Sequence, residues 1–128
     1  MLLSLALLTA QPAFADWPVV VSVQVASTKA DGEAWDVMGG APDIGICVVT
    51  ASNTACDPSK LGKCQDAFSC SLRAIVPDEA FTVWVYDLDL SANDTIGAAT
   101  CNGRGFGNGA GLRHCDVSDR VTSMTISK

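Results

Sequence analysis

The chain has few of the residues that catalytic triads and nucleic-acid-binding surfaces need: histidine is rare, and basic residues are outnumbered by acidic ones. It contains one histidine, His114, and no G-x-S-x-G turn, so no triad of nucleophile, histidine and acid is indicated. Its 14 acidic residues outnumber 8 basic ones and give a net charge of −6. That balance argues against nucleic acid as a partner and against adsorption to anionic lipid by charge alone. Neither a helical period nor an internal repeat is visible, which argues against a helical fold.

Long hydrophobic runs are confined to the beginning of the chain. Residues 1–15 carry no charge and combine an apolar stretch, residues 2–8, with the small-x-small sequence Ala13-Phe14-Ala15. This pattern is typical of a secretory signal peptide, and it is shorter than the roughly 20 apolar residues of a membrane-spanning helix. We therefore expect a signal peptide over residues 1–15, one domain over residues 16–128, and a secreted or periplasmic location.

Six cysteines follow the expected signal peptide. An even number of cysteines in this context indicates disulfides in an oxidising compartment. Their order favours a Cys101–Cys115 bridge and one bridge within the group Cys56, Cys64 and Cys70. A zinc site is the weaker alternative, because closely spaced Cys-x-x-Cys pairs are lacking. The expected disulfide residues are Cys47, Cys56, Cys64, Cys70, Cys101 and Cys115.

Alternation of apolar and other residues is the main secondary-structure signal. Residues 19–26 place four valines on one face, and residues 80–86 carry apolar side chains on both faces, as a central strand does. Turn-forming Gly, Pro, Asn and Asp residues separate these segments from other β-type segments. The pattern predicts an all-β sandwich or barrel. The remaining predicted strands cover residues 44–50, 70–76, 96–101 and 121–126.

Aspartates gather in two segments of the chain. Asp36 and Asp43 flank Gly39-Gly40, and a second run begins with Asp87-Leu88-Asp89 and continues to Asp94. Residues two apart in a strand project to the same side, so Asp87 and Asp89 leave the strand end together. Several carboxylates in loops are the hard oxygen ligands that calcium requires. Ordinary turn formation is the alternative for either segment taken alone.

The two aspartate segments, in this order, resemble the calcium-binding loops of the C-two domain, the module shared by protein kinase C and the synaptotagmins. The likeness rests on Trp35-Asp36…Gly39-Gly40-Ala41-Pro42-Asp43 and on Val85-Tyr86-Asp87-Leu88-Asp89…Asp94-Thr95-Ile96-Gly97. It covers roughly residues 19–101. The resemblance implies an antiparallel eight-stranded Greek-key β-sandwich, here with disulfides added. It also implies calcium as the cofactor, with Asp36, Asp43, Asp87, Asp89 and Asp94 as ligands.

Membrane attachment is the function that the resemblance implies. Val37, Met38 and Leu90 stand at the expected loop tips, where lipid-binding members of the family insert apolar side chains. A phospholipid surface is therefore the expected partner. Two alternatives remain open: a calcium-stabilised module for a protein or glycan partner, and a metal-free, disulfide-rich secreted effector. In all three cases we expect a binding protein and not an enzyme.

Two further motifs are weaker. The glycine-rich stretch of residues 103–111 lacks the Lys-Ser/Thr of a Walker loop, so a loop closed by Cys101 and Cys115 is the better interpretation. Asp87 and Asp89 could be imagined as a glycosidase pair, but a cation explains the clustered acids better. We expect Trp35 to support the first aspartate loop.

Overall fold

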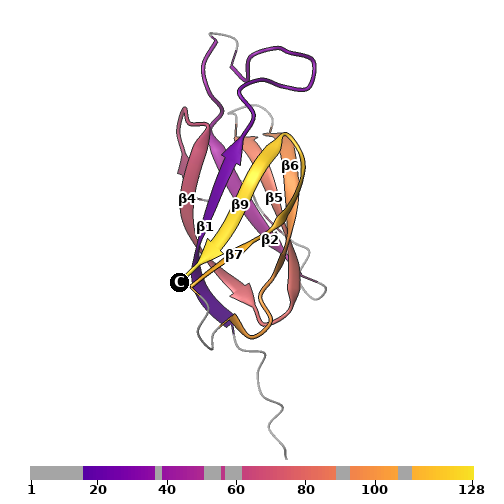
Figure 1. Cartoon of the computed structure of the whole chain (residues 1–128). Coiled ribbons are helices and arrows are strands. Elements are labelled where there is room, and N and C mark those ends of the chain that lie inside the picture. The colour runs from indigo at the N-terminus through magenta and orange to yellow at the C-terminus, as the bar shows by residue number, and fades with distance from the viewer. Residues whose placement is uncertain (1–15, 37–38, 51–55, 57–61, 89–92, 107–110) are drawn as a thin grey trace, which may run out of the picture.

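The computed structural model describes residues 16–36, 39–50, 56, 62–88, 93–106 and 111–128, and this part of the chain is all-β. Its nine strands form two antiparallel sheets, with the orders β4-β1-β9-β7 and β3-β2-β5-β6-β8 (Figure 1). The strands are β1 (Asp16–Val25), β2 (Ile44–Val49), β3 (Lys63–Cys64), β4 (Ser69–Pro77), β5 (Ala80–Leu88), β6 (Asn93–Asn102), β7 (Leu112–His114), β8 (Asp116–Asp119) and β9 (Val121–Ser127).

All six strands predicted from the alternation are confirmed, and their ends differ by three residues or fewer. The expected number of eight differs from the nine strands of the described residues. The three strands that the pattern did not predict, β3, β7 and β8, are short and have no buried residue. Each lies at an edge of its sheet, where one neighbouring strand supplies the hydrogen bonds and no buried face is required.

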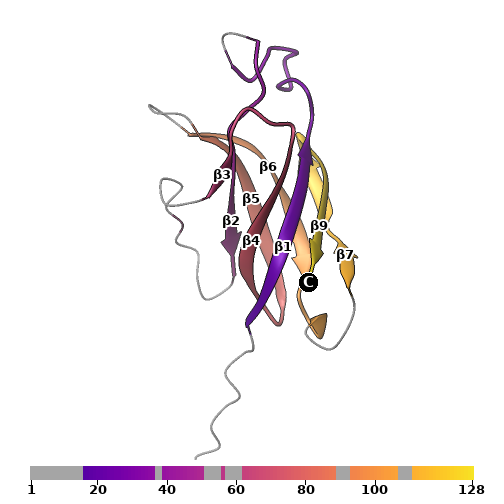
Figure 2. The same ribbon diagram turned by 90° about the vertical axis from the view of Figure 1, so that its left-hand side faces the viewer.

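One hydrophobic core joins the two sheets into a sandwich-like arrangement (Figure 2). The valines at 19, 21, 23 and 25 face this core from β1, and Phe81, Val83 and Val85 face it from β5. β5 lies in the centre of its five-stranded sheet, as its apolar faces predicted. The opposite face of β5 carries Trp84, of which 38% is exposed.

All six cysteines form disulfides: Cys47–Cys56, Cys64–Cys70 and Cys101–Cys115. The predicted Cys101–Cys115 bridge and the predicted bridge within the group of three are confirmed. Because no free cysteine remains, thiolates are not available for the alternative zinc site. Three disulfides indicate an oxidising environment, extracellular or periplasmic. Among the described residues no helix is long and apolar enough to cross a membrane.

Phe106 lies in the glycine-rich stretch and is nevertheless completely buried. The Arg113 guanidinium lies over its ring, 5.1 Å from the centroid. Arg113 also donates hydrogen bonds to the backbone oxygens of Asn102 and Arg104, at 3.0 and 2.7 Å. The aromatic ring and the Cys101–Cys115 bridge therefore both hold residues 101–106 against the core.

We expect Phe106→Ala to lower the free energy of unfolding by about 3–5 kcal/mol, because it leaves a cavity in a closely packed core. Phe68 is the matched control, since 42% of it is exposed and its loss leaves no enclosed space. Phe68→Ala should change stability by less than about 0.5 kcal/mol. Urea unfolding of the oxidised proteins measures both values. Equal losses in the two variants would contradict the packing role of Phe106.

Candidate functional site

Aspartates from four segments meet at one end of the sheets. The connection of residues 26–43 leaves β1 after Val25 and enters β2 at Ile44 (Figure 1). It meets the turn between β3 and β4, which contains Asp66, and the end of β5, which contains Asp87. The start of β6, with Asp94, pairs with the same end of β5.

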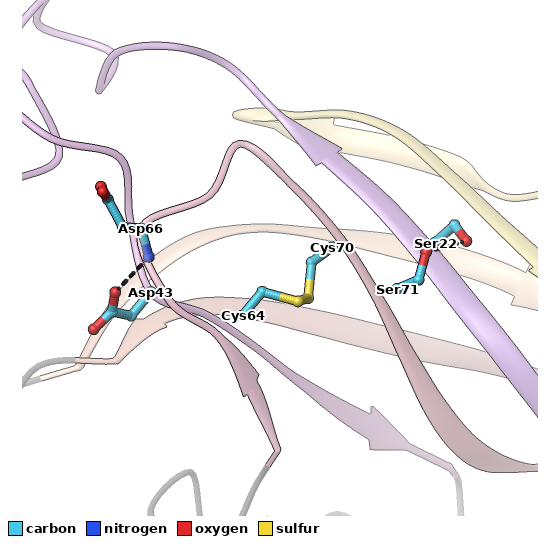
Figure 3. The surroundings of a disulfide bond; sticks show 6 residues. All are labelled: Ser22, Asp43, Cys64, Asp66, Cys70 and Ser71. Atoms are coloured by element: carbon cyan, nitrogen blue, oxygen red, sulfur yellow. Dashed lines mark hydrogen bonds between the residues drawn. A yellow bond between two sulfur atoms is a disulfide. The ribbon is translucent and has the colours of Figure 1, made fainter.

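Three of these aspartates are linked by hydrogen bonds that run from carboxylate to backbone. The Asp43 N–H donates to Oδ1 of Asp87 at 3.0 Å, and the Asp66 N–H donates to Oδ1 of Asp43 at 2.8 Å (Figure 3). The Ala41 N–H then donates to Oδ1 of Asp66 at 2.9 Å. We call this series the aspartate relay. It ties the ends of β5 and β2 to the turn before β4.

Backbone hydrogen bonds reinforce the relay at two points. The Leu88 N–H donates to the Asp43 oxygen, and the Ala67 N–H donates to the Pro42 oxygen, both at 2.9 Å. Gly45 makes the close approach of β5 possible. A β-carbon there would lie only 2.5 Å from Cδ1 of Leu88, so a larger residue would displace that side chain.

The side chains of Asp36 and of the relay residue Asp66 both lie close to Gly40. A β-carbon built on Gly40 would lie 3.0 Å from Oδ1 of Asp66 and 3.6 Å from Oδ2 of Asp36. Carboxylate oxygens from two loops thus border the same small space beside the backbone. Gly40 keeps that space open because it has no side chain.

Asp94 lies directly opposite Asp87 in the β5–β6 pairing. Directly opposite residues of antiparallel strands project to the same face, with their β-carbons about 4.5–5.5 Å apart. Asp87 is buried, with 3% exposed, whereas Asp94 is exposed. Like charges in this position repel each other unless a cation or a proton neutralises one of them.

The structure brings four of the five predicted ligands, Asp36, Asp43, Asp87 and Asp94, to one end of the molecule. The fifth, Asp89, lies outside the described residues, as do the predicted membrane contacts Val37, Met38 and Leu90. Asp66 was not predicted. It is 23 residues from Asp43 in sequence, and its only local signal is that aspartate favours turns.

Trp35 supports the first loop as predicted. It is 7% exposed, and its Nε1 donates to the Ala26 oxygen at 2.8 Å. The Gly39 N–H donates to the Asp36 oxygen at 2.9 Å in the turn that follows. The loop is therefore anchored to the core one residue before Asp36.

The donor set has the chemistry of a hard-cation site, because carboxylate oxygens are what calcium and magnesium bind. The described side chains alone do not complete such a site. Among them, with Asp89 left out, no three His, Cys, Asp or Glu residues are grouped so that they could hold a metal ion. All three relay carboxylates, those of Asp43, Asp66 and Asp87, already accept a backbone hydrogen bond. A cation would need oxygens beyond those of the described arrangement.

We expect Asp66→Ala to destabilise the protein by about 1–2 kcal/mol. Asp66 has a φ of +49°, a left-handed conformation that alanine adopts unfavourably, and alanine offers no acceptor to Ala41. Asp66→Asn keeps an acceptor oxygen and tolerates this conformation, so it should stay within about 0.5 kcal/mol of the parent protein. Urea unfolding in EDTA compares the two. Equal losses would show that neither the acceptor nor the backbone conformation of Asp66 matters.

No protein-family model matches this chain, and no curated protein matches it. The likeness to the C-two domain rests on the residues quoted for it, and it enters the function as a proposal.

Proposed function

We propose that this protein is a calcium-binding module that attaches to a phospholipid surface when calcium is bound. The observation that carries the proposal is the meeting of Asp36, Asp43, Asp66, Asp87 and Asp94 at one end of the sheets. These residues come from three parts of the chain that are distant in sequence: residues 36–43, Asp66, and the β5–β6 hairpin with Asp87 and Asp94. Turn formation explains an aspartate in each segment, but it does not explain why the segments meet.

Electrostatic repulsion supports a cation at this end. Asp87 and Asp94 are opposite neighbours, and Asp36 and Asp66 border the same space beside Gly40. A divalent cation bound between them would neutralise this charge. Calcium suits such a set better than magnesium, because it accepts six to eight oxygens in a flexible geometry, whereas magnesium keeps several waters. Asp89, two residues after Asp87, is the candidate for a further ligand.

The connections agree with the resemblance to C-two domains. In that family the ligands come from two loops. Here Asp36 and Asp43 lie in the β1–β2 connection, and Asp87 and Asp94 lie at the strand ends that flank the β5–β6 connection. Val37, Met38 and Leu90 belong to these same connections. Their apolar side chains are the proposed contacts with the acyl region of the membrane, where each fully buried side chain contributes roughly 1.5–3 kcal/mol.

The aspartate relay favours a second candidate function without a metal. Each relay bond already gives a carboxylate oxygen a backbone partner, so the aspartates could serve to hold the loops. The protein would then be a disulfide-rich secreted module that presents these loops to a protein or glycan. Calcium dependence separates the two candidates.

We expect calcium at about 100 times its dissociation constant to stabilise the oxidised protein by about 2.7 kcal/mol, or roughly 10 °C in the unfolding temperature. Extracellular calcium modules bind at about 10⁻⁴–10⁻³ M, so millimolar calcium is the range to test against EDTA. Asp36→Asn/Asp94→Asn should lose most of this gain. In EDTA, Asp94→Asn alone should be as stable as the parent or more so, because it removes a like charge opposite Asp87.

Asp116→Asn is the matched control for the double variant. Asp116 is exposed on β8 and pairs with Thr100, several residues along β6 from Asp94. The control should keep the full calcium effect. An equal calcium effect in all three proteins would place the ion elsewhere, and the absence of any effect would favour the metal-free candidate.

We expect vesicles of mixed phosphatidylcholine and phosphatidylserine to sediment the protein in calcium but not in EDTA. Met38→Ser/Leu90→Ser should reduce the sedimented fraction while the thermal shift by calcium stays unchanged, because the tips contact lipid and not the ion. Phe68→Ser, another exposed apolar residue, is the control. A calcium-induced thermal shift without sedimentation would restrict the function to a calcium-stabilised module for a protein or glycan.

A further inference from the structure

We propose that a groove on the outer face of the sheet β4-β1-β9-β7 binds the anion of a fatty acid. The groove has a volume of about 500 Å³ and lies between Pro18–Val20 of β1 and Arg73–Ile75 of β4, with Lys128 beside it. This volume is within the range of small-molecule sites, about 300–1,000 Å³. The groove lies at the beginning of β1, whereas the aspartate loops follow its other end (Figure 1).

Apart from Arg73 and Lys128, the residues that line the groove are aliphatic. Pro18 pairs with Ile75 across β1 and β4, and Val20 follows on the same face of β1. Ile75 is 59% exposed, the largest exposed fraction among the large hydrophobic side chains described. An apolar chain laid along Pro18 and Ile75 would remove this surface from water.

One cation stands on the outer face beside the aliphatic surface: Arg73, which pairs with Val20 from β4. Lys128 also borders the groove, but its ammonium lies 5.7 Å from the ring centroid of Trp17, which packs against the core. The lining contains no acidic residue, although acids outnumber bases in the chain by 14 to 8. No hydrogen bond or ion pair of the Arg73 guanidinium occurs within the described residues. The guanidinium charge of Arg73 is complementary to a carboxylate above Val20.

The backbone beneath the groove distinguishes an acyl chain from a peptide. β1 is paired with β4 from Asp16 to Gln24 and with β9 from Val20 onward. On the β4 side its N–H and C=O groups are therefore used within the sheet along the whole groove, and on the β9 side they are used from Val20 onward. A peptide backbone there would leave its own polar groups without partners, which is costly, whereas an alkyl chain has none.

The test is isothermal titration calorimetry of the oxidised protein with dodecanoate, in EDTA so that calcium plays no part. We expect one bound dodecanoate per protein. Dodecanol, which has no charge, should bind about tenfold more weakly, since charge-assisted hydrogen bonds are lost. Dodecyltrimethylammonium, with the opposite charge, should bind more weakly still. In an NMR spectrum the indole signal of Trp17 should shift, because the Lys128 ammonium lies 5.7 Å from its ring centroid.

Two variants locate the site. Arg73→Gln and Ile75→Ser alter exposed side chains, and each should weaken dodecanoate binding about tenfold. Arg104→Gln and Phe68→Ser remove an exposed charge and an exposed apolar side chain elsewhere, and should leave binding unchanged. Equal binding by all variants, or binding of the cationic amphiphile as tight as that of dodecanoate, would overturn the proposal. So would displacement of dodecanoate by an acidic peptide with an apolar carboxyl terminus, which would make a peptide the occupant.

Discussion

The burial of the Asp87 carboxylate is the constraint on which the arrangement of the loops depends. Asp87 continues the inward-facing series of Phe81, Val83 and Val85, and only 3% of it is exposed. Removing a carboxylate from water costs several kcal/mol unless other groups replace the lost hydrogen bonds. The Asp43 N–H is one such group, at 3.0 Å. Because Asp43 then accepts a hydrogen bond from Asp66, the last inward position of β5 fixes both the entry to β2 and the turn before β4.

A structural role of the aspartate relay does not oppose a role in ion binding. Each relay bond occupies Oδ1 of an aspartate and so fixes the orientation of the whole carboxylate. Carboxylates that bind metals are commonly held in this way by hydrogen bonds, which lower the cost of ordering them when the ion arrives. Carboxylate oxygens outside the relay, above all those of Asp36 and Asp94, would then supply most of the binding energy for the ion. For this reason the substitutions that separate the two proposed functions are at Asp36 and Asp94, and not at the buried Asp87.

The long strands could be predicted from the sequence because each buries one face, and burial imposes a period of two. The short strands β3, β7 and β8 bury no residue, so they leave no such pattern. Phe106 was missed for a related reason: it is one buried ring among glycines, and a single apolar residue has no period. Asp43 and Asp87 could be predicted as neighbours through a family resemblance, whereas Asp66 could not. Its position depends on the path of the chain between Cys64 and Cys70, and no local motif records that path.

The distribution of charge along β1 links the two proposed sites. Aspartates border the connection that follows Val25, while Arg73 and Lys128 lie near Pro18 and Val20 at the other end of the strand. The two groups of opposite charge are thus kept apart by the part of β1 from Val20 to Val25, roughly 17 Å. At ordinary ionic strength, charges are screened over about 8–10 Å, so a ligand at either end of β1 is affected mainly by the charges at that end. A net charge of −6 therefore does not exclude an anionic ligand, because an anion above Val20 lies beside Arg73 and is screened from the aspartates of the loops.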